Sequence, residues 1–202
     1  MTEQEIQEVI IDFHVPRNIV DHMKEVDRVA LLIGKKLIEN GEELDLHLIH
    51  TACMLHDLFK LCDFEDINMA YLKEEFTEED KEFWREIIRT YHKYGHVIAA
   101  YKYFQEKGEN KLATIIKKHD YFSLVEERLQ DRPNTWEEKL LYYADKRVLN
   151  DLVVSLEHRL EDGRKRYHQG VITEKDKQVE KKLYELEAEI FTAAGISDDD
   201  TF

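Results

Sequence analysis

Two adjacent residues, His56 and Asp57, are the strongest candidates for chemistry in the sequence. They follow an apolar stretch, and a carboxylate buried beside an imidazole is costly unless it is paired or binds a metal ion. Neighbouring side chains on a helix point about 100° apart. The two residues can therefore bind one ion only where the backbone leaves regular helix; otherwise each would contribute to a different side of the site. A histidine with an aspartate suits Fe, Mn, Zn, Ni or Co better than Ca²⁺. Because a His-Asp dipeptide alone carries little information, the residues that accompany it decide its meaning.

Two further segments supply ligand-type residues in a helical setting. His22 opens an amphipathic stretch, and Asp145 is the one acid that interrupts the apolar face of residues 140–148. The order His22, His56–Asp57, Asp145 resembles the H…HD…D signature of the HD-domain superfamily of metal-dependent phosphohydrolases.

The segment around the His-Asp pair, residues 54–60, resembles the central motif of that superfamily. In the motif, HD is commonly followed by Ile-Gly-Lys. Here Leu58 and Phe59 replace the isoleucine and glycine, while Lys60 keeps the lysine. The resemblance extends over about residues 16–147, which is most of the chain.

Two later segments, residues 95–101 and 115–120, resemble the parts of some HD proteins that contribute two more histidine ligands. In members with six ligands, two metal ions share the aspartate of the HD pair. The resemblance therefore implies one metal held by His22, His56, Asp57 and Asp145, and a second held by Asp57, His96 and His119. The alternative is that His96 and His119 line a substrate pocket above a single metal.

Several cations lie close in sequence to these ligands. The resemblance implies that Lys60 contacts a substrate phosphate, and we expect Asp57 and Lys60 to be the catalytic residues. Arg28, Lys146, Arg147 and His92 are further candidates for substrate binding. The alternative for Arg28, Lys146 and Arg147 is ion pairing on a helix surface, which contributes little to stability. The acids Asp63, Glu65 and Asp66 follow the motif, and the sequence assigns them no role.

Helical periodicity and a scarcity of breakers predict an all-α fold. The 202 residues include only two prolines and seven glycines, and no alternating run indicates a strand. We expect helices over residues 2–13, 16–39, 44–58, 77–94, 96–107, 110–119, 135–149 with a continuation to 167, and 173–194. The expected architecture is a single HD-domain helical bundle with extra C-terminal helices: an N-terminal helix packing on the domain (1–15), the catalytic core (16–152), and a C-terminal helical extension with a frayed acidic tail (153–202).

Composition restricts the partners of the protein. With 29 Lys and Arg against 44 Asp and Glu, the formal net charge is −15, which repels nucleic acid polymers and anionic membranes. No apolar stretch approaches the roughly 20 residues needed to span a bilayer. Residues 1–7 do not resemble a signal peptide, so we expect Cys53 and Cys62 to be free thiols in a reducing cytoplasm. The last helix could pack on the domain or form a homodimer.

The leading functional hypothesis is metal-dependent hydrolysis of a phosphate ester or phosphoanhydride in a small nucleotide-like substrate. One or two divalent ions (Fe, Mn, Ni, Co, Zn or Mg) would be the cofactor. Some HD-fold proteins with the same six ligands are diiron oxygenases, so oxygenase activity on a small anionic substrate is the main alternative. A non-catalytic nucleotide-binding sensor is the third.

Overall fold

The computed structural model describes residues 1–65, 67, 71–72, 75–167 and 171–197, and this part of the chain is almost entirely helical. The helices are α1 (Glu3–Asp12), α2 (Arg17–Glu39), α3 (Leu46–Leu55), α4 (Glu78–Tyr91), α5 (Gly95–Glu106), α6 (Asn110–Lys117), α7 (Trp136–Asp145), α8 (Leu156–Tyr167) and α9 (Glu174–Ala194). Short 3₁₀ turns are η1 (Lys60–Asp63), η2 (His92–Tyr94), η3 (Tyr121–Val125) and η4 (Leu129–Asp131), and the strands are β1 (Val148–Leu149) and β2 (Leu152–Val153). The expected all-α fold is confirmed.

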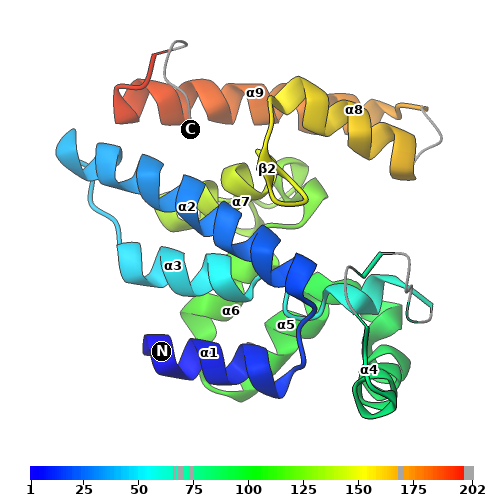
Figure 1. The fold of residues 1–202 in the computed structure, drawn as a ribbon. Coiled ribbons are helices and arrows are strands. Elements are labelled where there is room, and N and C mark those ends of the chain that lie inside the picture. The colour runs from blue at the N-terminus through cyan, green and yellow to red at the C-terminus, as the bar shows by residue number, and fades with distance from the viewer. Residues whose placement is uncertain (66, 68–70, 73–74, 168–170, 198–202) are drawn as a thin grey trace.

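The long helix α2 organises the layers of the molecule (Figure 1). It packs on α3 and α7 on one side and on α9 on the other. Its buried side chains recur every three or four residues, as one face of a helix requires. The helix follows Pro16, whose fixed φ is compatible with helix entry, and the chain then reverses at Gly41 with φ +95°. This arrangement places the N-terminal half of α2, with His22, over the end of α3.

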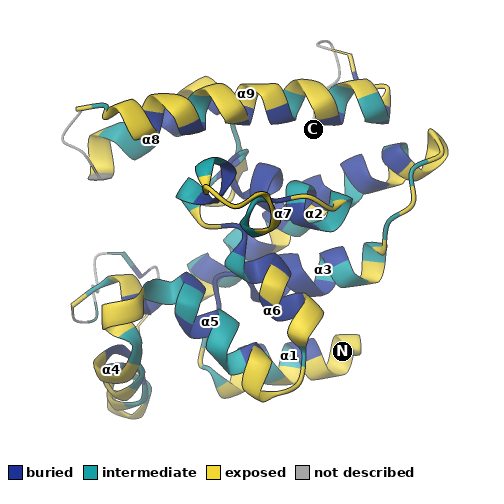
Figure 2. Cartoon of the chain, turned by 180° about the vertical axis from the view of Figure 1, so that it is seen from behind, coloured by how far each residue is buried: buried dark blue, intermediate teal, exposed yellow. Residues whose placement is uncertain are grey.

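Helix α3 is short and lies in the core (Figure 2). Asp45 accepts a hydrogen bond from the backbone N–H of Leu48 and begins the helix. The helix ends at Leu55, so the prediction of a helix to residue 58 is wrong at its C-terminal end. His56 and Asp57 lie in the turn that follows, where both side chains can face the same space.

Beyond Asp145 the structure also differs from the sequence prediction. Helix α7 ends there, and β1 pairs antiparallel with β2 around Asn150, which has φ +58°. The helical prediction is therefore wrong over residues 146–155, between α7 and α8, and the expected absence of strands is wrong as well. Local periodicity continued across this segment, but the pairing of its backbone with residues 152–154 replaces the helical hydrogen bonds. At α6, Glu109 rather than Asn110 precedes the helix.

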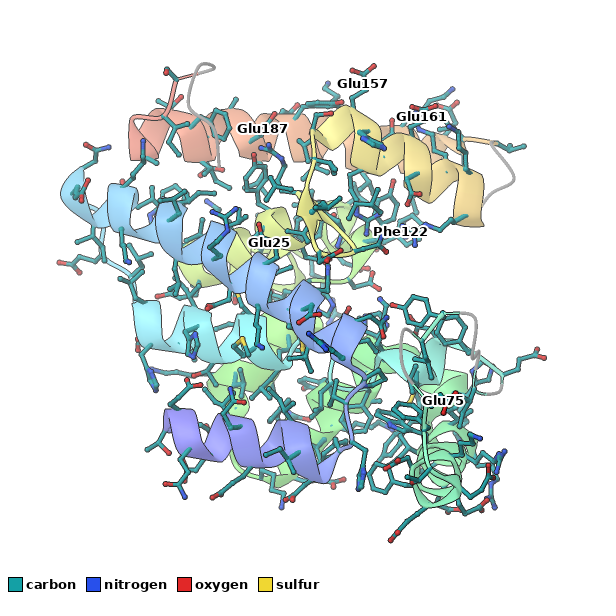
Figure 3. The ribbon with its side chains drawn as sticks, viewed as in Figure 1. Glu25, Glu75, Phe122, Glu157, Glu161 and Glu187 are labelled. Carbon is teal, nitrogen blue, oxygen red and sulfur yellow. The ribbon has the colours of Figure 1, made fainter. Side chains whose placement is uncertain are left out.

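The C-terminal helices cover the core from one side. Helix α9 begins after Thr173, as predicted, and the structure shows a capping box there between Thr173 and Asp176. The helix buries an apolar face against α2 and α7, while its other face is exposed (Figure 2). Arg164 on α8 pairs with Glu180 on α9 at 2.6 Å, and Glu157 and Glu161 lie on the outer side of α8 (Figure 3). Helix α9 thus packs on its own chain. Residues 198–202 of the predicted acidic tail lie outside the described residues.

None of the helices in the described ranges is long and apolar enough to cross a membrane. The boundaries at residues 15 and 152 remain predictions.

Candidate metal centre

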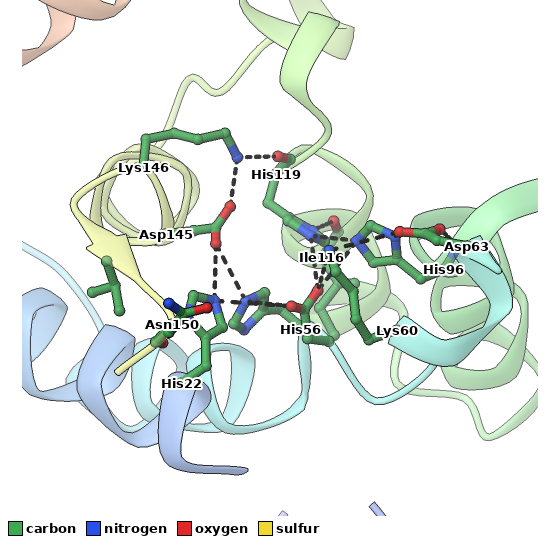
Figure 4. Close-up of polar contacts among 12 residues, drawn as sticks. His22, His56, Lys60, Asp63, His96, Ile116, His119, Asp145, Lys146 and Asn150 are labelled. Carbon is green, nitrogen blue, oxygen red and sulfur yellow. Dashed lines mark hydrogen bonds and ion pairs between the residues drawn. The ribbon is translucent and has the colours of Figure 1, made fainter. Parts of the chain in front are cut away.

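The six residues expected to bind metal converge on one site, although they are spread over more than 120 positions of the sequence (Figure 4). Helix α2 contributes His22, the turn after α3 contributes His56 and Asp57, and the first turn of α5 contributes His96. His119 follows α6, and Asp145 is the last residue of α7. The core packing of α2, α3 and α7, together with α5 and α6, therefore assembles the site.

One side of the site consists of His22, His56 and Asp145. The Oδ1 atom of Asp145 lies 3.1 Å from His22 Nε2 and 3.7 Å from His56 Nε2. One ligand atom from each residue falls within a mutual distance of 4.8 Å, which is compatible with a shared ion. We call these three residues the first half-site.

The opposite side consists of His96 and His119, whose Nε2 atoms lie 3.3 Å apart. His119 is buried, and the side chain of His96 is 14% exposed. We call this pair the second half-site.

Asp57 lies between the two half-sites and directs one carboxylate oxygen to each. Its Oδ2 is 3.8 Å from Nε2 of both His22 and His56. Its Oδ1 is 3.2 Å from His96 Nε2 and 3.9 Å from His119 Nε2. Asp57 could in this way contribute one oxygen to each of two ions. One ligand atom each of His56, Asp57 and His119 also lies within 4.8 Å of the others, so the two half-sites adjoin at Asp57.

The tautomers of the four histidines are fixed by their outer partners. Nδ1 of His22, His56 and His119 lies 2.7, 2.8 and 2.5 Å from the backbone carbonyls of Asn150, Cys53 and Ile116, respectively. A carbonyl only accepts, so each Nδ1 carries a proton and each neutral ring presents the Nε2 lone pair to the site. His96 Nδ1 donates in the same way to the carboxylate of Asp63.

A cation is the group that fits this arrangement of acceptors. When the rings are neutral, His96 and His119 direct lone pairs at each other, and His22 directs one at the Asp145 carboxylate. Among the described residues, the buried atoms His56 Nε2 and Asp57 Oδ1 have no hydrogen-bond partner of acceptable geometry. Buried polar atoms are normally satisfied, and metal-binding histidines normally donate their other N–H to a carbonyl or carboxylate. The chemistry and orientation of these donors therefore fit divalent transition-metal ions.

The electrostatic surroundings keep the acids ionised. Burial alone would raise the pKa of Asp57, but Lys60 and His56 outweigh burial and hold this pKa well below its usual range. Burial would likewise raise the pKa of Asp145, but Lys146 outweighs burial and holds this pKa well below its usual range. Both side chains are therefore carboxylates, the form that binds metal.

The two histidines of the second half-site respond differently to their surroundings. Burial, with His56 and His96 nearby, lowers the pKa of His119 well below its usual value. Burial and Lys60 oppose protonation of His96, yet the nearby carboxylates of Asp57 and Asp63 raise its pKa. A metal ion would replace the proton that His96 takes up beside these carboxylates.

Two of the predicted cations lie at the site. Lys60 Nζ is 3.6 Å from Asp57 Oδ1, and its side chain is 21% exposed, so it can meet both the acid and an incoming ligand. Lys146 Nζ lies 2.5 Å from Asp145 Oδ2 and 3.3 Å from the carbonyl of His119, and it is buried. Lys146 thus supports ligands of both half-sites, a different role from the substrate binding expected for it.

The structure places Arg28, Arg147 and His92 outside the cluster. Arg28 pairs with Glu25 at 2.7 Å on the surface of α2, where Glu25 is labelled in Figure 3. Arg28 follows His22 by six residues, which on a helix is a rotation of about 240°. The helical phase alone therefore directs Arg28 away from the face that carries His22.

Arg147 bonds to the Val154 carbonyl and to Glu187 of α9, so it connects the hairpin and the C-terminal helix. His92 is exposed and donates from Nδ1 to the carbonyl of Cys62 at 2.8 Å. None of these contacts involves a candidate ligand.

Sequence reasoning missed two partners of the ligands, Asn150 and Asp63. The carbonyl of Asn150 reaches His22 only because the chain forms a hairpin where a helix was predicted. Asp63 follows the His-Asp motif in the sequence, and it meets His96, 33 residues away, only in the folded chain. No local pattern signals either contact. Glu65 is exposed, and Asp66 lies outside the described residues.

Comparison with known proteins agrees with this geometry. The family model described as HD domain matches residues 19–148, which is more than half of the chain and includes all six candidate ligands. A search of curated proteins and a search of solved structures returned no significant match.

Proposed function

The chain belongs to the HD-domain family, and on this basis we propose that it is a metal-dependent phosphohydrolase. The proposed reaction is cleavage of a phosphate ester or phosphoanhydride in a small, anionic, nucleotide-like substrate. The single observation that carries the proposal is the division of the Asp57 carboxylate between two sets of ligands, with Oδ2 facing His22 and His56 and Oδ1 facing His96 and His119.

The donor set supports two divalent ions. His22, His56 and Asp145 would hold one ion, His96 and His119 the other, and Asp57 would contribute one oxygen to each. Such a pair, when bound, supplies a hydroxide at neutral pH and clamps a phosphate. The four histidines are oriented in advance by their Nδ1 partners, so the ligands need little rearrangement on binding.

Lys60 is the residue that we assign to substrate phosphate. It lies beside Asp57 on the second half-site and remains partly exposed, whereas Lys146 is buried against Asp145. A lysine next to the reacting group neutralises charge that develops on phosphate oxygens. In a chain with net charge −15, such a local cation also favours a small anion over a polynucleotide.

The direct test is phosphate release from a panel of nucleotides by purified protein supplied with Mn²⁺, Fe²⁺, Co²⁺ or Ni²⁺. We expect turnover of at least one substrate. Asp57→Ala should reduce it by at least about 10³-fold, because the shared ligand is lost and the electrostatic stabilisation supplied by the ions goes with it. A melting curve for each protein separates loss of activity from loss of fold. Full activity in Asp57→Ala would contradict the proposal.

The same assay separates the other two functions. Substrate-dependent oxygen uptake by the iron-loaded protein, without phosphate release, would indicate an oxygenase. Nucleotide binding without turnover in the presence of every metal would indicate a sensor. Either result would replace the hydrolase proposal.

A further inference from the structure

His96 differs from the other three histidines of the site in the group that holds its Nδ1 atom. Backbone carbonyls hold His22, His56 and His119. His96 Nδ1 lies 2.8 Å from Oδ1 and 2.7 Å from Oδ2 of Asp63 (Figure 4). At His96 the acceptor of the Nδ1 hydrogen bond is therefore a charged side chain instead of a backbone carbonyl. Hydrogen bonds to a charged acceptor are stronger than those to a neutral one.

Asp63 contacts the backbone of His96 as well as its ring. Its Oδ1 accepts from the His96 backbone N–H at 3.0 Å, at the first turn of α5. A carboxylate is favourable at this end of a helix because the free N–H groups carry partial positive charge. Gly95, with φ +72°, makes the tight entry into α5, and a Cβ atom there would lie 3.6 Å from Asp63 Oδ1. The backbone conformation thus brings ring and N–H to the same carboxylate.

Asp63 is also the partner of Lys60. Lys60 Nζ lies 3.7 Å from Asp63 Oδ2 and 3.6 Å from Asp57 Oδ1. Asp57 Oδ1 lies in turn 3.2 Å from His96 Nε2. These polar contacts form a closed ring at the second half-site, which runs from Asp57 to Lys60, Asp63, His96 and back to Asp57.

The segment that carries Asp63 is itself held in place. Asp63 is the last residue of η1, and the carbonyl of the preceding Cys62 accepts a hydrogen bond from His92 Nδ1. Cys62 is fully buried, while the Asp63 side chain is one-third exposed. The backbone is therefore anchored beneath a side chain that stays accessible from solvent.

We propose that Asp63 is a positioning residue for the second half-site, which fixes the tautomer and orientation of His96 and keeps Lys60 beside Asp57. The inference rests on the proposed metal centre. Its physical basis is that a carboxylate accepts but cannot donate, so the proton of the neutral His96 ring must stay on Nδ1 and the Nε2 lone pair must face the site.

Asp63→Asn tests this role with almost no change of shape. The amide retains an oxygen for the His96 backbone N–H, but its nitrogen then lies at the Oδ2 position, close to Nδ1. An amide nitrogen there donates, which favours the tautomer with the proton on Nε2. That tautomer cannot bind a metal through Nε2, so the substitution should weaken the second half-site and spare the first.

The first measurement is a Co²⁺ titration followed by visible absorption, with metal per chain determined after dialysis. We expect two Co²⁺ per wild-type chain. In Asp63→Asn the first should bind normally and the second about 10- to 100-fold more weakly, the usual effect of losing an outer partner of a ligand. The matched control is Asp45→Asn, an identical change at the start of α3, where Asp45 caps the helix through Leu48. It should leave both ions in place.

The second measurement needs no metal. Nitrogen-15 NMR of the histidine rings in the apo-protein, at a pH where imidazoles are neutral, reports which nitrogen carries the proton. The His96 signal, identified by its loss in His96→Ala, should show Nδ1–H in the wild type and Nε2–H in Asp63→Asn. A change of fold stability alone would not exchange these tautomers.

The outcomes distinguish the inference from the function on which it rests. Two Co²⁺ per wild-type chain, with unchanged second-ion affinity and an unchanged His96 tautomer in Asp63→Asn, would overturn the role of Asp63 and leave the metal centre intact. Fewer than two Co²⁺ per wild-type chain would overturn the two-ion centre and the inference together.

Discussion

The two half-sites are built from different kinds of structure. His22, His56 and Asp145 come from α2, the end of α3 and α7, which pack on one another in the core, and buried Lys146 supports Asp145. His96 and His119 come from the start of α5 and the end of α6. At the second half-site, the group that orients His96 is a side chain one-third exposed to solvent.

The ligands of the first half-site are held in position mainly by core packing, whereas His96 of the second half-site is held by a polar contact with a side chain. A group held by a backbone carbonyl moves only with the backbone that carries that carbonyl, which is the helix end for His56 and the β1–β2 turn for His22. Groups fixed by an accessible carboxylate can be perturbed by one side chain. We therefore expect the first half-site to be the tighter one and the second to be more easily altered.

The largest expected effect is on metal content in His22→Ala and His119→Ala. Each change removes a direct ligand from one half-site only, so each protein should retain about one ion per chain. The loss of affinity should exceed the roughly 10- to 100-fold cost of losing an outer partner. Elemental analysis after dialysis against Co²⁺ measures it. If either variant kept both ions, the division into half-sites would be wrong.

A smaller effect is expected from Lys146→Met, which removes the cation beside Asp145. Breaking a buried ion pair leaves an uncompensated charge and costs about 3 kcal/mol in the apo-protein. A bound ion would itself neutralise the charge of Asp145. The loss in the free energy of unfolding should therefore be smaller in the metal-bound protein than in the apo-protein. Urea denaturation of both forms measures the two values. Equal destabilisation with and without Co²⁺ would argue against a metal ligand at Asp145.

The smallest expected effect concerns a polar contact between α1, α2 and α3 that involves none of the candidate ligands. His50 of α3 lies 3.0 Å from Asp27 of α2 and 2.7 Å from Glu3 of α1. Burial lowers the pKa of His50, but the bonds to Glu3 and Asp27 outweigh it and raise this pKa above 6.5. Since the folded-state pKa is raised, its stabilising contribution is complete below about pH 6.5 and disappears as pH rises through the folded-state pKa.

His50→Gln should therefore lower the free energy of unfolding by up to about 1 kcal/mol at acidic pH and by less at alkaline pH. Urea denaturation at two pH values measures this difference, and metal content should not change. His47→Gln is the matched control, because His47 lies one turn away and contacts only the Met1 carbonyl at 2.6 Å among its described hydrogen bonds. A larger effect of His50→Gln at alkaline pH would contradict the assignment.

Much of the fold was predictable because helices follow local rules. The spacing of apolar residues located α2. The helix starts predicted at Thr135 and Thr173 are those of α7 and α9, because a threonine that caps a helix is a local signal. The prediction failed where the end of a helix depends on distant contacts. Helix α3 stops at Leu55, and the chain after Asp145 forms a hairpin although its composition continues the helical pattern.

The candidate site divides in the same way. The sequence alone indicated which residues could bind metal, because the order of these residues resembles the six-ligand HD pattern. They are His22, His56, Asp57, His96, His119 and Asp145. Only the tertiary structure decided that Asp57 turns one oxygen to each half-site, that Asp63 holds His96, and that Arg147 is directed to α9. The physical reason is that residue type and helical phase are local properties of the chain. Which side chains face each other is set by the packing of helices, which brings together candidate ligands up to 123 positions apart in the sequence.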